Sequence, residues 1–189
     1  DTGFPMTIVR PSLTYDTVIP VALAGFKEYT IVDRILRGQK IIVHGDGTSL
    51  WTVTHSDDFA AGFLGLVGNP QAVGHAFHIT SDEILTWNQL YTILAGAVGK
   101  TAHIVHIPSD FICRVDPSQT GNLLGDKAAS VIFDNTKIKT FVPGFKAVIP
   151  FYQGIRRTLA WFDANPERKI ANPKTNEMID RIIKAYEGL

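Results

Sequence analysis

The stretch at residues 40–61 constrains the fold most, because it places four local structures in a fixed order. A β-branched run at 41–43 leads into a turn of glycine and small polar residues at 45–49, and a second β-type run follows at 51–54. Polar residues at 56–58 stand where the N-terminus of a helix is expected, ahead of an apolar run. The pattern predicts strand, turn, strand and helix in succession, which is typical of an α/β domain.

The rest of the chain predicts further short strands and amphipathic helices. Thr86 is expected to cap a helix whose apolar residues recur at helical spacing from Trp87 to Val98, and Gly99 is expected to end it. The run at 103–107 predicts a strand that pairs with the first strand of the stretch above in a small sheet. Other expected elements are helices at 26–36, 57–67, 148–162 and 178–186, strands at 6–9 and 75–79, and helical turns with loop at 109–129.

Composition narrows the class of protein. The chain has 189 residues, of which 45% are hydrophobic, enough for one ordinary domain with a real core. Its formal net charge is zero, from 18 basic and 18 acidic residues, which argues against a broad nucleic-acid-binding surface. The single cysteine, Cys113, indicates a reducing compartment, and its apolar neighbours favour a buried thiol. Because no long apolar run and no signal-peptide pattern occur, we expect a cytoplasmic protein without a membrane span.

Residues 55–60 read His-Ser-Asp-Asp-Phe-Ala, after a glycine turn and a short β-type run. This order resembles the substrate-binding half of the extended short-chain dehydrogenases/reductases, the NAD-dependent epimerase/dehydratase family, which has His-Val-x-Asp-apolar-Ala at this place. The run at 7–12 resembles the sixth strand of the family's Rossmann sheet, residues 85–90 its apolar-Thr-apolar-x-Glu-Leu motif, and residues 131–138 its strand-to-helix Asp-x-Ser-Lys motif. The resemblance extends over 7–162, and its specificity lies in the order and spacing of the motifs.

The resemblance implies an α/β fold: the C-terminal part of a Rossmann-type, NAD(P)-binding extended short-chain dehydrogenase/reductase fold, with a small substrate-binding subdomain. Residues 1–189 would form a single substrate-binding portion that contributes late strands, at about 6–10 and 75–79, to a Rossmann sheet whose N-terminal dinucleotide-binding half is absent. The family needs a G-x-x-G-x-x-G loop and a Tyr-x-x-x-Lys pair. Gly45 and Gly47 lie between two strands, and no tyrosine has lysine four residues later. We therefore expect no catalytic residue in this chain.

The resemblance also assigns binding residues. In the family, the loop after the sixth strand lies over the nicotinamide, which implies that Pro11, Ser12 and Leu13 lie near NAD or NADP. Trp51 replaces an arginine that clamps the diphosphate of nucleotide sugars, a role that tryptophan cannot fill. Trp51 would instead be a core residue or an apolar pocket wall. The residues expected at the substrate are Thr14, Tyr15, Val43, His44, Trp51 and His55.

Other polar residues have structural explanations. The two histidine pairs in predicted strands are each three residues apart, which puts the partners on opposite faces, so we expect no metal site. Asp57 and Asp58 fit a helix N-terminus better than a catalytic carboxylate pair. His55 fits a buried, hydrogen-bonded histidine better than a ligand-binding one, and Arg156 and Arg157 fit a solvated helix face.

The function implied is the substrate-binding part of an NAD(P)-dependent epimerase, dehydratase or reductase, inactive alone, that acts on a small hydroxylated or carbonyl substrate, with a sugar as one candidate. Two alternatives stay open: a dihydroflavonol-type carbonyl reductase, and a non-catalytic relative that senses NADP or binds RNA or protein. The expected partners are the small-molecule substrate and the chain's own N-terminal Rossmann half. Because the strand at 6–9 would keep an open apolar edge, a homodimer that buries this edge is a further expectation.

Overall fold

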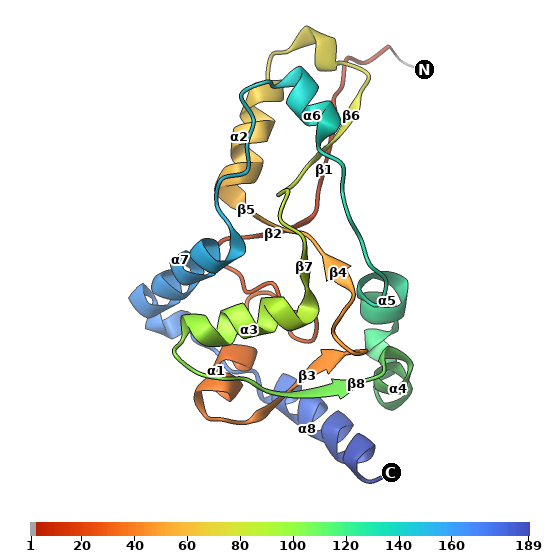
Figure 1. Ribbon diagram of the computed structural model, residues 1–189, viewed down its shortest axis with the longest axis vertical. Helices are drawn as coiled ribbons and strands as arrows, with labels where there is room; N and C mark the ends of the chain where they lie inside the picture. Colours follow the sequence, from red (N-terminus) through yellow and green to blue (C-terminus); the bar gives the residue numbers. More distant parts are fainter. Residues whose placement is uncertain (1–2) are drawn as a thin grey trace.

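The computed structural model describes residues 3–189; Asp1 and Thr2, in the N-terminal stretch where no signal peptide is expected, lie outside the described residues. The molecule is elongated, with its short strands near the long axis and helices around them (Figure 1). Within 3–189, no helix is both long and apolar enough to cross a membrane. The strands are β1 Ile8–Pro11, β2 Leu13–Tyr15, β3 Lys40–His44, β4 Leu50–Trp51, β5 Val53–His55, β6 Ala76–Ile79, β7 Leu85–Thr86 and β8 His103–Ile107.

Helices interrupt the strands in the first part of the chain, and among the described elements only helices follow β8. Thr86 caps the clearest one, α3, through a capping box with Gln89, which confirms the predicted start of this helix. The helices are α1 Thr30–Leu36, α2 Ser56–Leu66, α3 Trp87–Ala97, α4 Ser109–Val115, α5 Thr120–Asn122, α6 Thr136–Phe141, α7 Phe151–Ala164 and α8 Pro173–Glu187. Short 3-10 turns lie at η1 Pro70–Ala72, η2 Pro117–Gln119 and η4 Pro166–Arg168, and a π-helical turn lies at η3 Leu123–Lys127.

The described strands form four two-stranded sheets. β3 and β8 pair in parallel, with Lys40 opposite His103, which confirms the predicted small sheet. β1 and β6 also pair in parallel, with Ile8 opposite Ala76, so the two predicted late strands are neighbours. The β2–β5 pair is parallel and the β4–β7 pair is antiparallel. Parallel pairs need long crossover connections, and the intervening helices supply them.

Two separate clusters of buried apolar side chains divide the molecule. The large core lies around Trp87, Tyr91 and Phe151 and packs α1, α3, α7 and α8 against β3 and β8. The small core lies between α2, α6 and the β1–β6 pair, at the opposite end of the long axis (Figure 1). The small core consists of Leu66, Ala72, Phe77, Ile79, Ile138 and Phe145.

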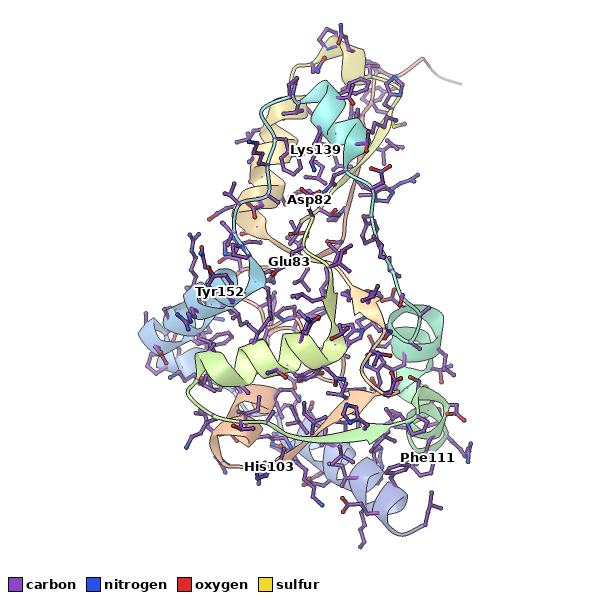
Figure 2. All side chains as sticks on the ribbon, viewed as in Figure 1. Asp82, Glu83, His103, Phe111, Lys139 and Tyr152 are labelled. Carbon is purple, nitrogen blue, oxygen red and sulfur yellow. The ribbon has the colours of Figure 1, made fainter. Side chains whose placement is uncertain are left out.

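Carboxylates join the two ends of the molecule. Asp58, buried near the start of α2, accepts hydrogen bonds from the backbone N–H groups of Val148 and Ile149, both at 2.9 Å. Glu83 accepts one from the backbone N–H of Phe151 at 2.7 Å, at the start of α7 (Figure 2). The end of the loop that leads from the small core into α7 is therefore fixed by bonds to residues 148, 149 and 151.

A polar cluster holds α6 against the end of β6. Asn135 donates to the Thr80 carbonyl at 2.7 Å and to Asp82 at 3.1 Å, and its own oxygen accepts from Thr80. Lys139 donates to both oxygens of Asp82 at 2.8 Å (Figure 2). Because Asn135 and Thr80 are buried, these bonds satisfy groups that water does not reach.

Several predicted boundaries are wrong. The strand expected at 6–9 lies at Ile8–Pro11, and the helix expected at 178–186 already begins at Pro173, where proline suits the first helical turn. Three others have long-range or local causes. The helix expected at 26–36 begins at Thr30, because the backbone N–H of Tyr29 is bonded to the Ile170 carbonyl and the chain before it runs as turns. The helix expected from Val148 begins at Phe151, since Pro150 disfavours helical geometry in the residue before it. The family-like motif at 131–138 contains no strand, because only the N–H of Val131 bonds a neighbouring strand, at the Leu50 carbonyl.

Two further corrections concern the stretch at 51–58. The β-type run breaks at Thr52, because Trp51 pairs with β7 whereas Val53 pairs with β2. The N-cap of α2 is His55 and not Ser56: the Nδ1 atom of His55 accepts a hydrogen bond from the backbone N–H of Asp57 at 3.2 Å. The N-cap acceptor of α2 is therefore a histidine nitrogen, whereas the side-chain oxygen of serine, threonine or aspartate is usual at this position.

Candidate ligand cavity

A cavity of about 400 Å³ opens where β1 ends and β2 begins. It brings together Pro11, Ser12 and Leu13, which the sequence places near the cofactor, and Trp51, which it places at the substrate. The remaining lining comes from three other segments: the β2–α1 loop, η3 and the strand-free run before α6. The lining residues are Pro11, Ser12, Leu13, Phe26, Trp51, Asp126, Lys127, Val131 and Phe133.

Hydrogen bonds fix the β1–β2 junction that forms one wall. The Ser12 and Thr54 hydroxyls lie 2.8 Å apart, and the backbone N–H of Ser81 donates to the Thr54 oxygen at 2.8 Å. The Thr14 hydroxyl donates to the Ser12 carbonyl at 3.3 Å, and Thr14 does not line the cavity. The Ser12 hydroxyl is therefore held against Thr54, and besides this hydroxyl the wall offers a ligand mainly backbone and carbon atoms.

Trp51 forms a rigid second wall. Its ring packs against that of Trp87, with centroids 5.5 Å apart and planes inclined by 35°, and β4 holds its backbone opposite Leu85. Trp51 is 7% exposed, and its indole N–H has no hydrogen-bond partner within the described residues. The sequence leaves open whether Trp51 is a core residue or a pocket wall. In the structure it belongs to the large core and also lines the cavity.

Lys127 contributes the cavity's cation, although it too is buried. Its ammonium group donates to the Asn122 oxygen at 2.8 Å and to Asp126 at 2.9 Å, and it lies 5.9 Å from the centroid of the Trp51 ring. The Lys127 carbonyl accepts a hydrogen bond from Nε2 of His44 at 2.9 Å. A buried ammonium needs such partners, because leaving it without them costs far more than a neutral group would.

Val43 and His44 lie behind this wall rather than in the lining. Both are completely buried in β3, and the His44 ring packs edge-on against Trp87 at 5.1 Å. Burial lowers the pKa of His44 below its ordinary value, although its bond to the Lys127 carbonyl opposes that shift. Because Nε2 donates to a carbonyl, neutral His44 carries its proton there. Their proposed substrate contacts stay predictions, and the observed geometry gives them a supporting position.

Tyr15 and His55 lie together, away from the cavity. The Tyr15 ring meets the rings of His55 and Phe151 edge-on, each at 5.4 Å, and its hydroxyl rests against Gly154 of α7. Burial, followed by the nearby carboxylate of Glu83, raises the pKa of Tyr15 well above its usual range. Neither the Tyr15 hydroxyl nor Nε2 of His55 has a hydrogen-bond partner among the described residues, although Nε2 lies 3.9 Å from a carboxylate oxygen of Asp16.

The sequence does not predict five of the residues that line the cavity: Phe26, Asp126, Lys127, Val131 and Phe133. Phe26 reads as part of a helix, and Val131 and Phe133 read as a strand. Lys127 follows a glycine-rich stretch without periodicity, where a lysine indicates a solvated loop. The one residue that could have indicated a buried Lys127 is Asn122, five residues earlier. The π-helical turn brings the Asn122 side chain within hydrogen-bond distance of the lysine.

Within residues 3–189, no glycine-rich loop leads from a strand into a helix, which is the arrangement that binds the pyrophosphate of a dinucleotide. Gly45 and Gly47 have the positive φ angles of 61° and 72° that glycine tolerates, but the turn leads into β4 and not into a helix. The space beside Gly47 is filled by the Asn88 side chain. In the same residues, no group of three or more histidine, cysteine or acidic side chains could hold a metal ion.

No model of a known protein family matches the chain. One curated protein, the 2′-dehydrokanamycin reductase of Streptomyces kanamyceticus, is 30% identical over 74 residues, which are 39% of this chain and 21% of that protein. Solved structures resemble the fold more broadly. The UDP-glucuronic acid 4-epimerase of Bacillus cereus, in complex with NAD, has a TM-score of 0.63 at 15% identity, over 91% of this chain and 47% of that one.

Two further structures agree. The UDP-glucose 4-epimerase of Thermotoga maritima, with UDP-glucose, has a TM-score of 0.63 at 21% identity over 87% of this chain and 48% of that one. The dTDP-glucose 4,6-dehydratase DesIV of Streptomyces venezuelae, with NAD, has a TM-score of 0.61 at 21% identity over 87% and 46%. This chain thus spans about half the length of these structures. Its fold is that of the C-terminal part of the Rossmann-type epimerases and dehydratases, as the sequence resemblance implies.

Proposed function

We propose that this chain is the substrate-binding part of an NAD(P)-dependent epimerase, dehydratase or reductase of the extended short-chain dehydrogenase/reductase family, acting on a small hydroxylated or carbonyl compound. The observation that carries the proposal is the cavity, in which the run Pro11–Leu13 meets Trp51. The fold supports the class of enzyme, since the similar structures include NAD complexes. The short stretch shared with a reductase supports carbonyl chemistry, and a sugar remains one candidate substrate.

We further propose that β1 completes a Rossmann sheet with a second, N-terminal half of the same protein. Within the described residues β1 pairs with β6 alone, and Met6 and Ile8 are 51% and 45% exposed. Parallel sheets are normally covered on both faces, so this bare strand needs a partner. The chain's length, about half that of the similar structures, supports the same reading. A second copy of the chain, which would form a homodimer through β1, is the alternative partner.

The cellular location we propose is the cytoplasm. The buried free thiol of Cys113 supports it, because free thiols persist in reducing compartments.

The isolated chain should be inactive, because Tyr-x-x-x-Lys and a pyrophosphate loop would have to come from the other half. The test is to read the coding sequence upstream of Asp1 and to titrate NAD and NADP, by calorimetry, into the 189-residue chain and into the longer product. We expect a G-x-x-G-x-x-G loop and a Tyr-x-x-x-Lys pair upstream, and cofactor binding only by the longer product. Micromolar binding of either cofactor by the 189-residue chain would contradict the proposal, and a longer product without these motifs would favour the non-catalytic alternative.

A further inference from the structure

We propose that this cavity, within the proposed function on which the inference rests, selects a flat and largely apolar ligand with one oxygen acceptor, and that Lys127 is its specificity-determining residue. The ligand class is a cyclic, conjugated carbonyl or hydroxyl compound rather than a nucleotide diphosphate. The argument uses the apolar walls, the hydrogen-bonding capacity left on Lys127, and the charge balance beside it.

The walls favour a flat apolar ligand. Six lining residues are apolar, and three of these are aromatic and come from three different segments. The Trp51 ring is held by Trp87 and is 7% exposed, so it borders the cavity as a fixed apolar wall, while Phe26, which is 45% exposed, is the open aromatic face of the lining. Aromatic faces bind conjugated rings by offset stacking and area burial, and neither interaction requires charge. The six are Pro11, Leu13, Phe26, Trp51, Val131 and Phe133.

Lys127 can offer a ligand one hydrogen bond. An ammonium group has three N–H donors, and Asn122 and Asp126 accept two of them. One donor therefore remains for a group in the cavity, which matches a single carbonyl or hydroxyl oxygen. Lys127 is only 7% exposed, so that donor is already largely removed from bulk water, where a hydrogen bond would compete with solvent.

The charge balance disfavours a diphosphate. Binding of such a group usually takes arginine or several cationic donors, because its oxygens carry more than one negative charge. The lining contains one lysine and no arginine, and Asp126 lies 2.9 Å from the lysine nitrogen and offsets its charge. Ser12 adds at most one neutral hydroxyl donor, because its oxygen lies in a hydrogen bond with Thr54. The lining therefore matches an uncharged acceptor better than a polyanion.

The experiment is calorimetric titration of the 189-residue chain with three probes: 7-hydroxycoumarin, which is flat and carries oxygen acceptors; naphthalene, which is flat without oxygen; and UDP. We expect 7-hydroxycoumarin to bind at least roughly tenfold more tightly than UDP. The variant Lys127→Met should bind 7-hydroxycoumarin roughly tenfold more weakly and naphthalene unchanged. Retained naphthalene binding shows that the variant cavity is folded, and Lys139→Met, an exposed lysine outside the lining, is the matched control.

Three results would overturn the inference: tighter binding of UDP than of 7-hydroxycoumarin, equal losses of both flat probes in Lys127→Met, or no binding of either flat probe to the unaltered chain. None of them bears on cofactor binding by a longer product, which tests the proposed function separately. Conversely, failure of the cofactor test leaves these titrations interpretable, because the probes require no dinucleotide.

Discussion

The two cores of this protein differ in how completely they are enclosed. The large core contains 31 buried apolar side chains and is surrounded by α1, α3, α7 and α8, whereas the small core contains six. Beside the small core, Leu64 of α2 and Val67, which follows α2, are 68% and 62% exposed. The large core is therefore enclosed on more sides than the small core, although strands contribute to both. Enclosure of apolar side chains, rather than the presence of strands, is what differs between the two cores.

Truncation in the large core should have the largest effect. Trp87 is fully buried and contacts Trp51, His44 and Tyr91. Trp87→Ala should reduce the free energy of unfolding by about 4 kcal/mol, since the enclosed site cannot collapse around the void. Denaturant unfolding followed by circular dichroism measures this. Trp161→Ala, at the core's periphery, is the control and should cost clearly less; equal losses would remove the distinction between centre and edge.

The same type of change in the small core should cost less and remain local. Phe77→Ala should reduce stability by about 3 kcal/mol, because the partly covered layer can close over the missing ring. Hydrogen exchange should accelerate at β1 and β6 and stay unchanged in α3. Phe63→Ala, which removes a 42% exposed ring on the same layer, should change stability by no more than roughly 1 kcal/mol. Uniform acceleration across the chain after Phe77→Ala would mean that the two cores unfold as one unit.

The link between the cores should contribute a smaller amount. Asp58→Ala leaves the backbone N–H groups of Val148 and Ile149 without acceptors, at a cost of about 2 kcal/mol. Asp57→Ala is the matched control, because the Asp57 side chain is 66% exposed and its ion pair with Arg157 is a surface contact. Thermal melting of both variants checks the prediction. A loss in Asp57→Ala as large as that in Asp58→Ala would assign the effect to the charge at the helix N-terminus instead.

The smallest effect is a pH dependence confined to the large core. The pKa of His44 is lowered by burial, so the unfolded chain takes up a proton below its ordinary pKa of 6.5 while the folded chain resists it. Stability should therefore be complete above pH 6.5 and decline as the pH falls towards 5. His44→Gln should flatten the decline in melting temperature between pH 7 and pH 5. His103→Gln, at an exposed position in β8, should leave it intact (Figure 2).

The sequence predicts elements whose signals are local. The capping box at Thr86 and the stripe of α3 require only neighbours along the chain, and both appear as expected. The β3 and β8 runs are recognisable as strands because both contain β-branched residues and end at a turn or proline; their pairing is expected from the sequence, and the structure adds that it is parallel. Boundaries fail where a distant segment decides them. The chain before α1 is held by Ile170, from more than 100 residues away, and the run at 51–54 divides between two partners.

The cavity is predictable only in part for the same reason. The resemblance implies Pro11, Ser12 and Leu13 near the cofactor and Trp51 at the substrate; the structure brings these four into one cavity lining, and their ligand contacts stay predictions. Lys127 cannot be found this way, since its burial depends on the π-helical turn and on the packing of that turn against Trp51. Nothing within a few residues of Lys127 distinguishes it from a solvated lysine.

The parallel pairing of β1 has a consequence for how this protein is made. Its partner β6 begins at Ala76, so β1 leaves the ribosome well before the strand it bonds. At 5–20 residues per second, synthesis of the intervening chain takes roughly 3 to 14 seconds. During this interval β1 lacks its β6 neighbour, and contacts between distant segments form slowly in any case. The β1–β6 pair, and the small core packed against it, can therefore form only after residues 76–79 have been synthesised.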